Sequence, residues 1–180
     1  MYPYLPPLQD AICLLKYRGK IALTSALAQL MIQRLPSLPA VDLIMPVPLH
    51  PTRLREREFN QSLLLADRVG ASLNQPISYA NLIRNTPSPP QTMLSRRGRL
   101  KNLRGAFRVQ EPDAVLGKRI LLIDDVYTTG TTVNECAKTL RKAGSSDVFV
   151  LTLARSMDTQ MVPDRVLAKH AAPVMELLGG

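Results

Sequence analysis

Apolar and polar residues follow two rhythms along the chain, one typical of helices and one typical of strands. Apolar side chains at helical spacing predict two helices near the start, at positions 8, 12 and 15 and at positions 23, 27, 30 and 31. Residues 41–48 predict a strand that runs into a proline-rich turn. From residue 52, a stripe through positions 59, 63, 66 and 73 predicts one amphipathic helix that stops before Pro76.

The second half of the chain repeats the order of strand and helix. Residues 77–83, 106–109, 119–124 and 147–153 predict strands, and positions 133, 136, 137 and 140 predict a helix closed by Gly144. Alternating strands and helices favour an α/β fold, a parallel sheet flanked by helices. We expect one domain over residues 1–180, with a small helical hood at 1–38, an α/β core at 39–155 and a tail at 156–180.

Candidate chemistry is concentrated in residues 120–132. Four consecutive aliphatic residues suit a buried central strand, and Asp124 and Asp125 follow where that strand should emerge at its carboxyl edge. A turn rich in hydroxyl groups comes next, with Gly130 inside it, and leads directly into the predicted helix. Backbone N–H groups at the start of a helix, together with threonine hydroxyls, can hold a phosphate.

Two acceptors for vicinal hydroxyls therefore lie next to a cradle for a phosphate, which is what a ribose 5-phosphate requires. Each part has an ordinary alternative, since an Asp-Asp pair at a strand end is common and Thr131 or Thr132 could simply cap the helix. The combination, in this order, favours the ligand site. A nucleotide P-loop is excluded because its G-x-x-x-x-G-K-[ST] string is absent.

Charge is unevenly distributed along the chain. The formal net charge is +9, and the segment from Arg84 to Arg108 holds seven Lys and Arg residues and no acidic one. Such a cluster predicts a polyanion or a phosphorylated ligand, with a merely solvated basic loop as the alternative. Aromatic residues make up only 4% of the chain, which argues against a platform that stacks many bases.

The cysteines and the apolar runs of the chain indicate the compartment in which the protein works. The two cysteines, Cys13 and Cys136, lie far apart and exclude both a disulfide scaffold and a cysteine-only zinc site. No apolar run is long enough to insert into a membrane, and the first residues lack the pattern of a signal peptide. We therefore expect a cytoplasmic protein.

Residues 120–132 resemble the phosphoribosyl pyrophosphate (PRPP) motif of the type I phosphoribosyltransferases. In that superfamily the adjacent acids bind the ribose hydroxyls and the following loop holds the 5-phosphate. The resemblance implies PRPP binding by Asp124, Asp125, Val126, Tyr127, Thr128, Thr129, Gly130, Thr131 and Thr132. It also implies Mg²⁺ held mainly by the substrate.

A second resemblance, to the competence protein F family, covers roughly residues 4–155. It rests on Pro46-Val47-Pro48-Leu49-His50-Pro51, on the following R-L-R-E-R and F-N-Q blocks, and on the segment from Gln91 to Asn102 with Ala106-Phe107. Glu58 stands where that family usually has glycine. Longer members carry a cysteine-rich zinc knuckle that this chain lacks, so we expect no zinc.

The superfamily also suggests which residues meet pyrophosphate. The loop after the first core strand takes that place, and its candidates here are Leu49, His50 and Arg53. Arg53 is favoured because a guanidinium can grip phosphate bidentately, whereas His50 could equally be a surface imidazole with no partner. The basic segment matches the long loop that closes over PRPP, and Arg97 or Arg99 could stabilise departing pyrophosphate.

Two functions remain open from the sequence. One is an enzyme that transfers phosphoribosyl from PRPP to a nitrogen acceptor. The other is a non-catalytic protein that keeps the PRPP fold and binds single-stranded DNA, because competence protein F relatives act in DNA uptake. The DNA-binding candidates are Arg96, Arg97, Arg99, Lys101 and Arg104. Partner proteins of a DNA-uptake machinery and a homodimer are left open.

Overall fold

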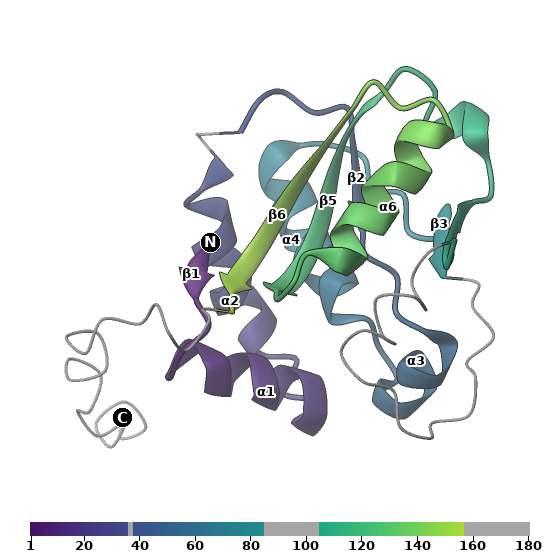
Figure 1. Ribbon diagram of the computed structural model, residues 1–180. Helices are drawn as coiled ribbons and strands as arrows, with labels where there is room; N and C mark the ends of the chain where they lie inside the picture. The colour runs from purple at the N-terminus through teal and green to yellow at the C-terminus, as the bar shows by residue number, and fades with distance from the viewer. Residues whose placement is uncertain (36–37, 85–104, 157–180) are drawn as a thin grey trace.

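The centre of the protein is a four-stranded parallel sheet with the order β1-β6-β5-β2 (Figure 1). The computed structural model describes residues 1–35, 38–84 and 105–156. The strands are β1 (Tyr2–Pro3), β2 (Leu43–Pro46), β5 (Arg119–Tyr127) and β6 (Asp147–Arg155). The parallel sheet flanked by helices that the sequence predicts is confirmed.

Strand β5 is central because its side chains are apolar on both faces. Residues 120–123 are completely buried. Leu121 and Ile123 join one core with the first helices of the chain, and Ile120 and Leu122 join a second core on the opposite face. Successive side chains of a strand point to opposite faces, so four aliphatic residues in a row are buried only when both faces are covered.

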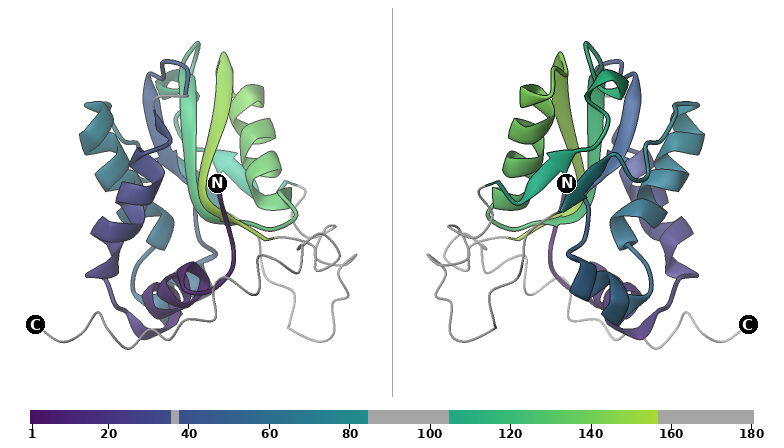
Figure 2. Two further views of the ribbon diagram at one scale, coloured as in Figure 1. Left: turned by 90° about the vertical axis from the view of Figure 1, so that its left-hand side faces the viewer. Right: turned by 90° about the vertical axis from the view of Figure 1, so that its right-hand side faces the viewer.

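Helices cover both faces of this sheet (Figure 2). α1 (Leu8–Arg18), α2 (Leu23–Ile32) and α4 (Gln61–Leu73) contribute to the first core, and α6 (Thr131–Lys142) contributes to the second. Gly19 ends α1 in the left-handed conformation, and Gly144 follows α6 with a φ of 98°. Both helices of the predicted hood form, but α2 packs against α4 and β6, while α1 lies beyond the carboxyl ends of the strands (Figure 1).

The prediction of a single helix from residue 52 onward is wrong. The chain instead forms α3 (Pro51–Arg57) and α4, separated at Glu58, which has a φ of 65°. Left-handed backbone cannot continue a right-handed helix, and α4 restarts at Asn60, whose side chain accepts a hydrogen bond from the Ser62 N–H. The break falls at the position where the competence protein F resemblance expects glycine.

The strand expected over residues 77–83 is also shorter and placed differently. Only β3 (Leu82–Arg84) forms, and it pairs antiparallel with β4 (Phe107–Val109) in a separate two-stranded sheet. Ile77 reaches the main sheet through one isolated bridge to Ile44. Among the described residues, no helix has the length and apolar character needed to cross a membrane.

Candidate functional site

The two acids of the predicted motif lie inside β5 rather than after it. β2 pairs with β5 only as far as Pro46 and Ile123, whereas β6 continues to pair with β5 up to Tyr127. Asp124 and Asp125 therefore lie beyond the end of β2, at the carboxyl edge of the sheet where α/β folds bind their ligands. The expected strand end at residue 124 was three residues short, because β6 supplies partners that the local sequence does not reveal.

Asp124 is held by two hydrogen bonds to one of its oxygens. Its Oδ1 accepts from the Ser62 hydroxyl and from the Asp125 N–H, each at 2.9 Å. Ser62 lies in the first turn of α4, and the cap residue Asn60 also donates to the Val47 carbonyl at 3.0 Å. The loop after β2, the start of α4 and the acid of β5 are thus joined by direct hydrogen bonds.

Asp124 carries an unusual proton affinity for a carboxyl group. Loss of water around it and, second, the charge of Asp125 raise its pKa to about 7, against the lowering effects of Ser62, the Asp125 N–H and Lys16. The side chain is only partly exposed. Adjacent carboxyl groups in a poorly hydrated place repel each other, so a proton is retained near neutral pH. Such a shift is common at functional sites, although structural clusters show it too.

Asp125 contributes to the site from a more enclosed position. The residue is 4% exposed, and its Oδ2 lies 2.8 Å from the Lys16 Nζ of α1. The contact is an ion pair without hydrogen-bond geometry, since Oδ2 is a buried oxygen that lacks a hydrogen-bond partner. The Asp125 Oδ2 therefore makes no hydrogen bond of its own and lies beside the positive charge of Lys16.

The hydroxyl-rich turn forms a hollow at the start of α6. Gly130 has a φ of 73° and immediately precedes α6, and a Cβ there would collide with the Tyr127 ring. Gly130 has no side chain to cap this helix end, and the Thr131 N–H donates only a long 3.5 Å hydrogen bond to the Thr129 hydroxyl, so the first turn can still offer N–H groups to a ligand. The hollow is lined by Asp124, Val126, Tyr127, Thr128, Gly130, Thr131, Thr132 and Val133.

Most of the predicted PRPP-binding residues are therefore brought together. The two that do not line the hollow are Asp125, which is turned toward Lys16, and Thr129, whose hydroxyl lies 2.8 Å from that of Thr131. Threonine hydroxyls, helix N–H groups and a neighbouring carboxyl group can together bind the phosphate and the hydroxyls of a sugar phosphate.

The predicted pyrophosphate loop leads from β2 into α3. Leu49 and His50 are partly buried. His50 caps α3 by accepting a hydrogen bond from the Thr52 N–H at its Nδ1, so the interpretation of a partnerless imidazole is wrong. Arg53 is exposed and forms a surface ion pair with Glu56 at 3.2 Å. Exposed pairs of this kind are weak, so Arg53 can exchange Glu56 for a phosphate.

The rest of the predicted site lies outside the described residues. This holds for the expected loop over PRPP and for Arg96, Arg97, Arg99, Lys101 and Arg104. Within the described ranges, no group of three or more His, Cys, Asp or Glu side chains could hold a metal ion.

The comparisons with known proteins agree with this geometry. Residues 60–170 match the phosphoribosyl transferase domain, a span that begins at the cap of α4 and includes β5 and α6. The chain belongs to this family. The matched span includes the turn at the carboxyl end of β5.

Two similar proteins show more closely which members of the family this chain resembles. The chain is 36% identical over 160 residues to the DNA utilization protein YhgH of Escherichia coli (strain K12), covering 86% of this chain and 70% of that protein. It is 32% identical over 161 residues to competence protein F of Haemophilus influenzae, covering 85% of this chain and 70% of that protein. The resemblance to competence protein F is confirmed, and this chain belongs to the same family as both proteins.

A solved structure shows the same fold. The glutamine PRPP amidotransferase of B. subtilis, in complex with ADP and GMP, superposes with a TM-score of 0.52 at 22% identity. The match covers 74% of this chain but only 26% of that chain. It confirms the type I phosphoribosyltransferase fold.

Three residues of the site were missed by sequence reasoning. Lys16, Asn60 and Ser62 come from the hood and from α4, far along the chain from the acids that they support. Asn60 had a usable signal, because asparagine before a helix is a common cap. Lys16 and Ser62 had none, since only tertiary packing brings them to β5.

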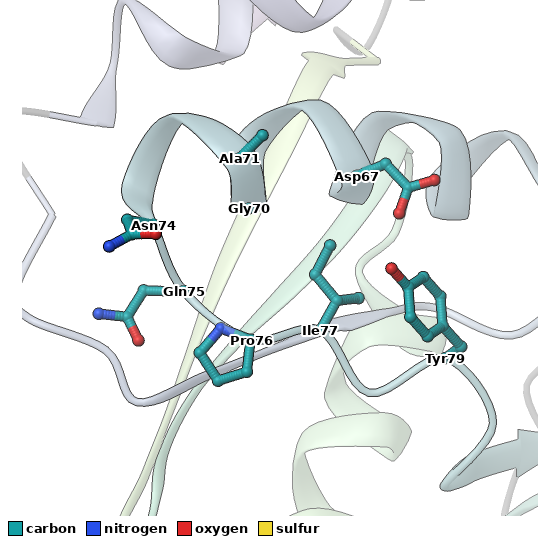
Figure 3. Close-up of a pocket in the computed structure, with 8 residues that line it drawn as sticks. All are labelled: Asp67, Gly70, Ala71, Asn74, Gln75, Pro76, Ile77 and Tyr79. Atoms are coloured by element: carbon teal, nitrogen blue, oxygen red, sulfur yellow. The ribbon is translucent and has the colours of Figure 1, made fainter.

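A second hollow lies at the other end of α4 and does not belong to this site (Figure 3). Its lining includes Asp67, Gly70, Asn74, Ile77 and Tyr79. The Tyr79 hydroxyl points toward Asp67, whose charge raises the pKa of that phenol. α4 begins beside Asp124, and the part of the hollow from Asp67 to Asn74 lies about 8–18 Å further along the helix axis than Ser62.

Proposed function

We propose that this chain binds PRPP together with Mg²⁺. One observation carries the proposal: the Asp124 carboxyl group and the first turn of α6 line one hollow at the carboxyl end of β5, where Asp125 is the next residue of the strand. A ribose with a 5-phosphate needs acceptors for its vicinal hydroxyls and donors for its phosphate, and these are the groups present. The family match adds a reason to choose PRPP over other sugar phosphates.

Each group of residues has a role in this proposal. The carboxyl groups of Asp124 and Asp125 accept hydrogen bonds from the ribose hydroxyls. Thr128, Thr131 and Thr132, with the N–H groups at the start of α6, hold the 5-phosphate. Leu49, His50 and Arg53 bring the loop after β2 next to the pyrophosphate, where the Arg53 guanidinium contacts its oxygens.

The described residues fit a substrate-held Mg²⁺. The Asp124 carboxyl group lines the hollow, so its oxygens are placed to accept from a ribose hydroxyl or from water around such an ion. When bound, the ion would neutralise the pyrophosphate and align it for departure. The protein's own task is then to orient the sugar and to exclude water from it.

Transfer of the phosphoribosyl group is the reaction that such a complex supports. A nitrogen nucleophile forms a bond to C1 of the ribose while the bond from C1 to the pyrophosphate oxygen breaks, and the electron pair leaves with pyrophosphate. Arg97 and Arg99 are the candidates to stabilise that leaving charge. The acceptor would lie on the side of α1, and a screen of nitrogen acceptors with labelled PRPP and Mg²⁺ would identify it.

Calorimetric titration of the unmodified chain tests the proposal. We expect saturable PRPP binding that requires Mg²⁺ and that is much weaker for ribose 5-phosphate, which lacks the pyrophosphate. Absence of PRPP binding with Mg²⁺ present would refute it.

A second function, binding of single-stranded DNA, is favoured by two specific observations. The relatives at 36% and 32% identity are named for DNA utilization and for competence. The segment from Arg84 to Arg108 carries seven of the chain's Lys and Arg residues without an acidic one. A role in competence, with partner proteins of DNA uptake, follows from the same names as part of this proposal.

Salt dependence tests DNA binding. Neutralising about six phosphates of single-stranded DNA predicts a slope near −4 in a plot of log K against log salt. Charge reversal at Arg96, Arg97, Arg99 and Lys101 should flatten this slope and leave PRPP binding to the described hollow detectable. If the unmodified chain binds no single-stranded DNA at low salt, this second function is wrong.

A further inference from the structure

One ion pair of this protein differs in burial from the others. The side chains of Lys16 and Asp125 are 15% and 6% exposed, and their charged atoms are 2.8 Å apart. In the parts of the chain that the structure describes, each of the other four ion pairs includes a side chain that is 43% exposed or more. The Lys16 pair is also the one that joins the hood to the central strand.

Stability is a weak explanation for such a pair. Two charges removed from water lose hydration, and their attraction often only balances that loss. The pair also lacks the hydrogen bonds that make buried ions favourable, because Asp125 Oδ2 has no hydrogen-bond partner. A role in the adjoining site is the better explanation for a lysine placed here.

The charges around Asp125 show what Lys16 supplies. Asp124 is the preceding residue in the chain, and negative charges on these two adjacent carboxyl groups repel each other. The Tyr4 phenol also lies near Asp125 and brings no positive charge. Among the described residues, the cation that contacts Asp125 is Lys16, so a positive charge lies 2.8 Å from that carboxyl group in a place with little water. A charged carboxylate is the stronger acceptor for a hydroxyl.

The helix that carries Lys16 also contacts α3 through the residue that follows this lysine. Tyr17 lies under the Arg57 guanidinium of α3 at 4.9 Å from the ring centre, and Arg57 donates a hydrogen bond to Gln61 at the start of α4. α1 and α3 both lie beyond the carboxyl ends of the strands (Figure 1). Lys16 is thus held over β5 by contacts that do not depend on its own charge.

We propose that Lys16 is a positioning residue of the ribose site, which holds the Asp125 carboxylate in place to accept a ribose hydroxyl. This inference rests on the proposed binding of PRPP. Through the Lys16 side chain, the N-terminal hood becomes part of the sugar site. This role is separate from any binding of the acceptor by the hood. Lys16 acts through Asp125 and contacts no reacting atom.

Calorimetry with PRPP and Mg²⁺ on matched variants tests this role. Lys16→Met keeps the length of the side chain and removes its charge, and we expect PRPP affinity to fall about tenfold or more. Lys20→Met is the control, because Lys20 is an exposed lysine that follows the same helix. It should bind PRPP like the unmodified chain, and Lys16→Arg, which keeps the charge, should recover most of the affinity.

A second ligand separates positioning from general damage. Pyrophosphate with Mg²⁺ makes no ribose contact, so its affinity should be the same in Lys16→Met and in the unmodified chain. Equal or tighter PRPP binding by Lys16→Met, or an equal loss for both ligands, would overturn the inference. Failure of the unmodified chain to bind PRPP would instead reject the proposed function itself.

The double variant Lys16→Met/Asp125→Asn covers the case in which Lys16→Met does not fold. It removes both charges, and replacing a buried ion pair by neutral groups is often tolerated. If Lys16 acts through Asp125, this variant binds PRPP as well as Asp125→Asn alone. A further loss in the double variant would show an independent role and contradict the inference.

Discussion

The two ends of β5 both place an aspartate next to a cation, yet they are built differently. At the amino end, Asp42 accepts from the Arg119 N–H, Nε and Nη2 at 2.9, 3.0 and 2.7 Å. At the carboxyl end, Asp125 meets Lys16 without a hydrogen bond, and Asp124 has a raised pKa. The first end has its polar groups satisfied, and the second leaves acceptors open.

The comparison separates a structural ion pair from a binding site. The Arg119 fork lowers the pKa of Asp42 well below its ordinary value, so the native state favours its charged form. The surroundings of Asp124 do the opposite and disfavour its charge. A group that the fold holds in an unfavourable state is better explained by a ligand that will meet it than by stability.

The largest effect is expected at the turn beyond the carboxyl end. Gly130→Ala places a Cβ against the Tyr127 ring and forces a positive φ on alanine, so we expect a loss of about 1–3 kcal/mol of stability and loss of PRPP binding. Gly117→Ala is the matched control before the amino end, with a φ of 67° and open space around it. It should cost about 1 kcal/mol and leave PRPP affinity unchanged. Denaturant unfolding and calorimetry measure both quantities, and equal effects of the two changes on binding would contradict the account.

A smaller effect is expected at the amino end. Asp42→Asn should lower the unfolding midpoint at pH 7 without changing PRPP affinity, because Asp42 is remote from the hollow. A carboxyl group with a lowered pKa contributes its full stabilisation above its ordinary value of 3.8, and that contribution is lost progressively as pH falls below 3.8 through the lowered native pKa. The variant and the unmodified chain should therefore converge in acid. Asp147→Asn, which breaks the longer 3.7 Å pair with Arg141, is the control and should change the midpoint less.

The smallest effect has the opposite sign. A carboxyl group whose native pKa is raised from 3.8 to about 7 makes the protein less stable as pH rises between these values. Asp124→Asn removes that penalty and can still accept the Ser62 hydrogen bond. We expect equal midpoints near pH 4 and, near pH 8, a midpoint about 2–4 °C higher in the variant, which corresponds to roughly 1 kcal/mol. A lower midpoint for Asp124→Asn at pH 8 would mean that the acid is structural.

At the carboxyl end of β5, the site residues that are adjacent in the sequence could be predicted, and those that come from distant segments could not. Residues 120–132 contain the buried strand, both acids, the glycine and the start of the helix, so their order alone indicates the site. Ser62 lies 62 positions from Asp124, and no periodic pattern marks it. Lys16 reads as one more basic residue near the end of a helix, and only the packing of α1 beyond β5 gives it a partner.

In the fold, too, the elements with a long regular sequence pattern could be predicted, and those that depend on tertiary contacts could not. The stripes of α1, α2 and α6 and the aliphatic run of β5 were sufficient because each is long and regular. The break at Glu58 was not visible, since a glutamate with positive φ is uncommon and its neighbours continue the helical pattern. β1 has only two residues and forms because β6 offers an open edge.

The most direct test of the central claim is PRPP binding by the double variant Asp124→Asn/Asp125→Asn. Calorimetry should show Mg²⁺-dependent binding to the unmodified chain and none to the double variant, because its amides are weaker acceptors for the ribose hydroxyls. Circular dichroism should show that the variant remains folded, since the acids lie at the end of the sheet rather than in its core. Unchanged PRPP affinity in the folded variant would contradict the assignment of the ribose site to the carboxyl end of β5.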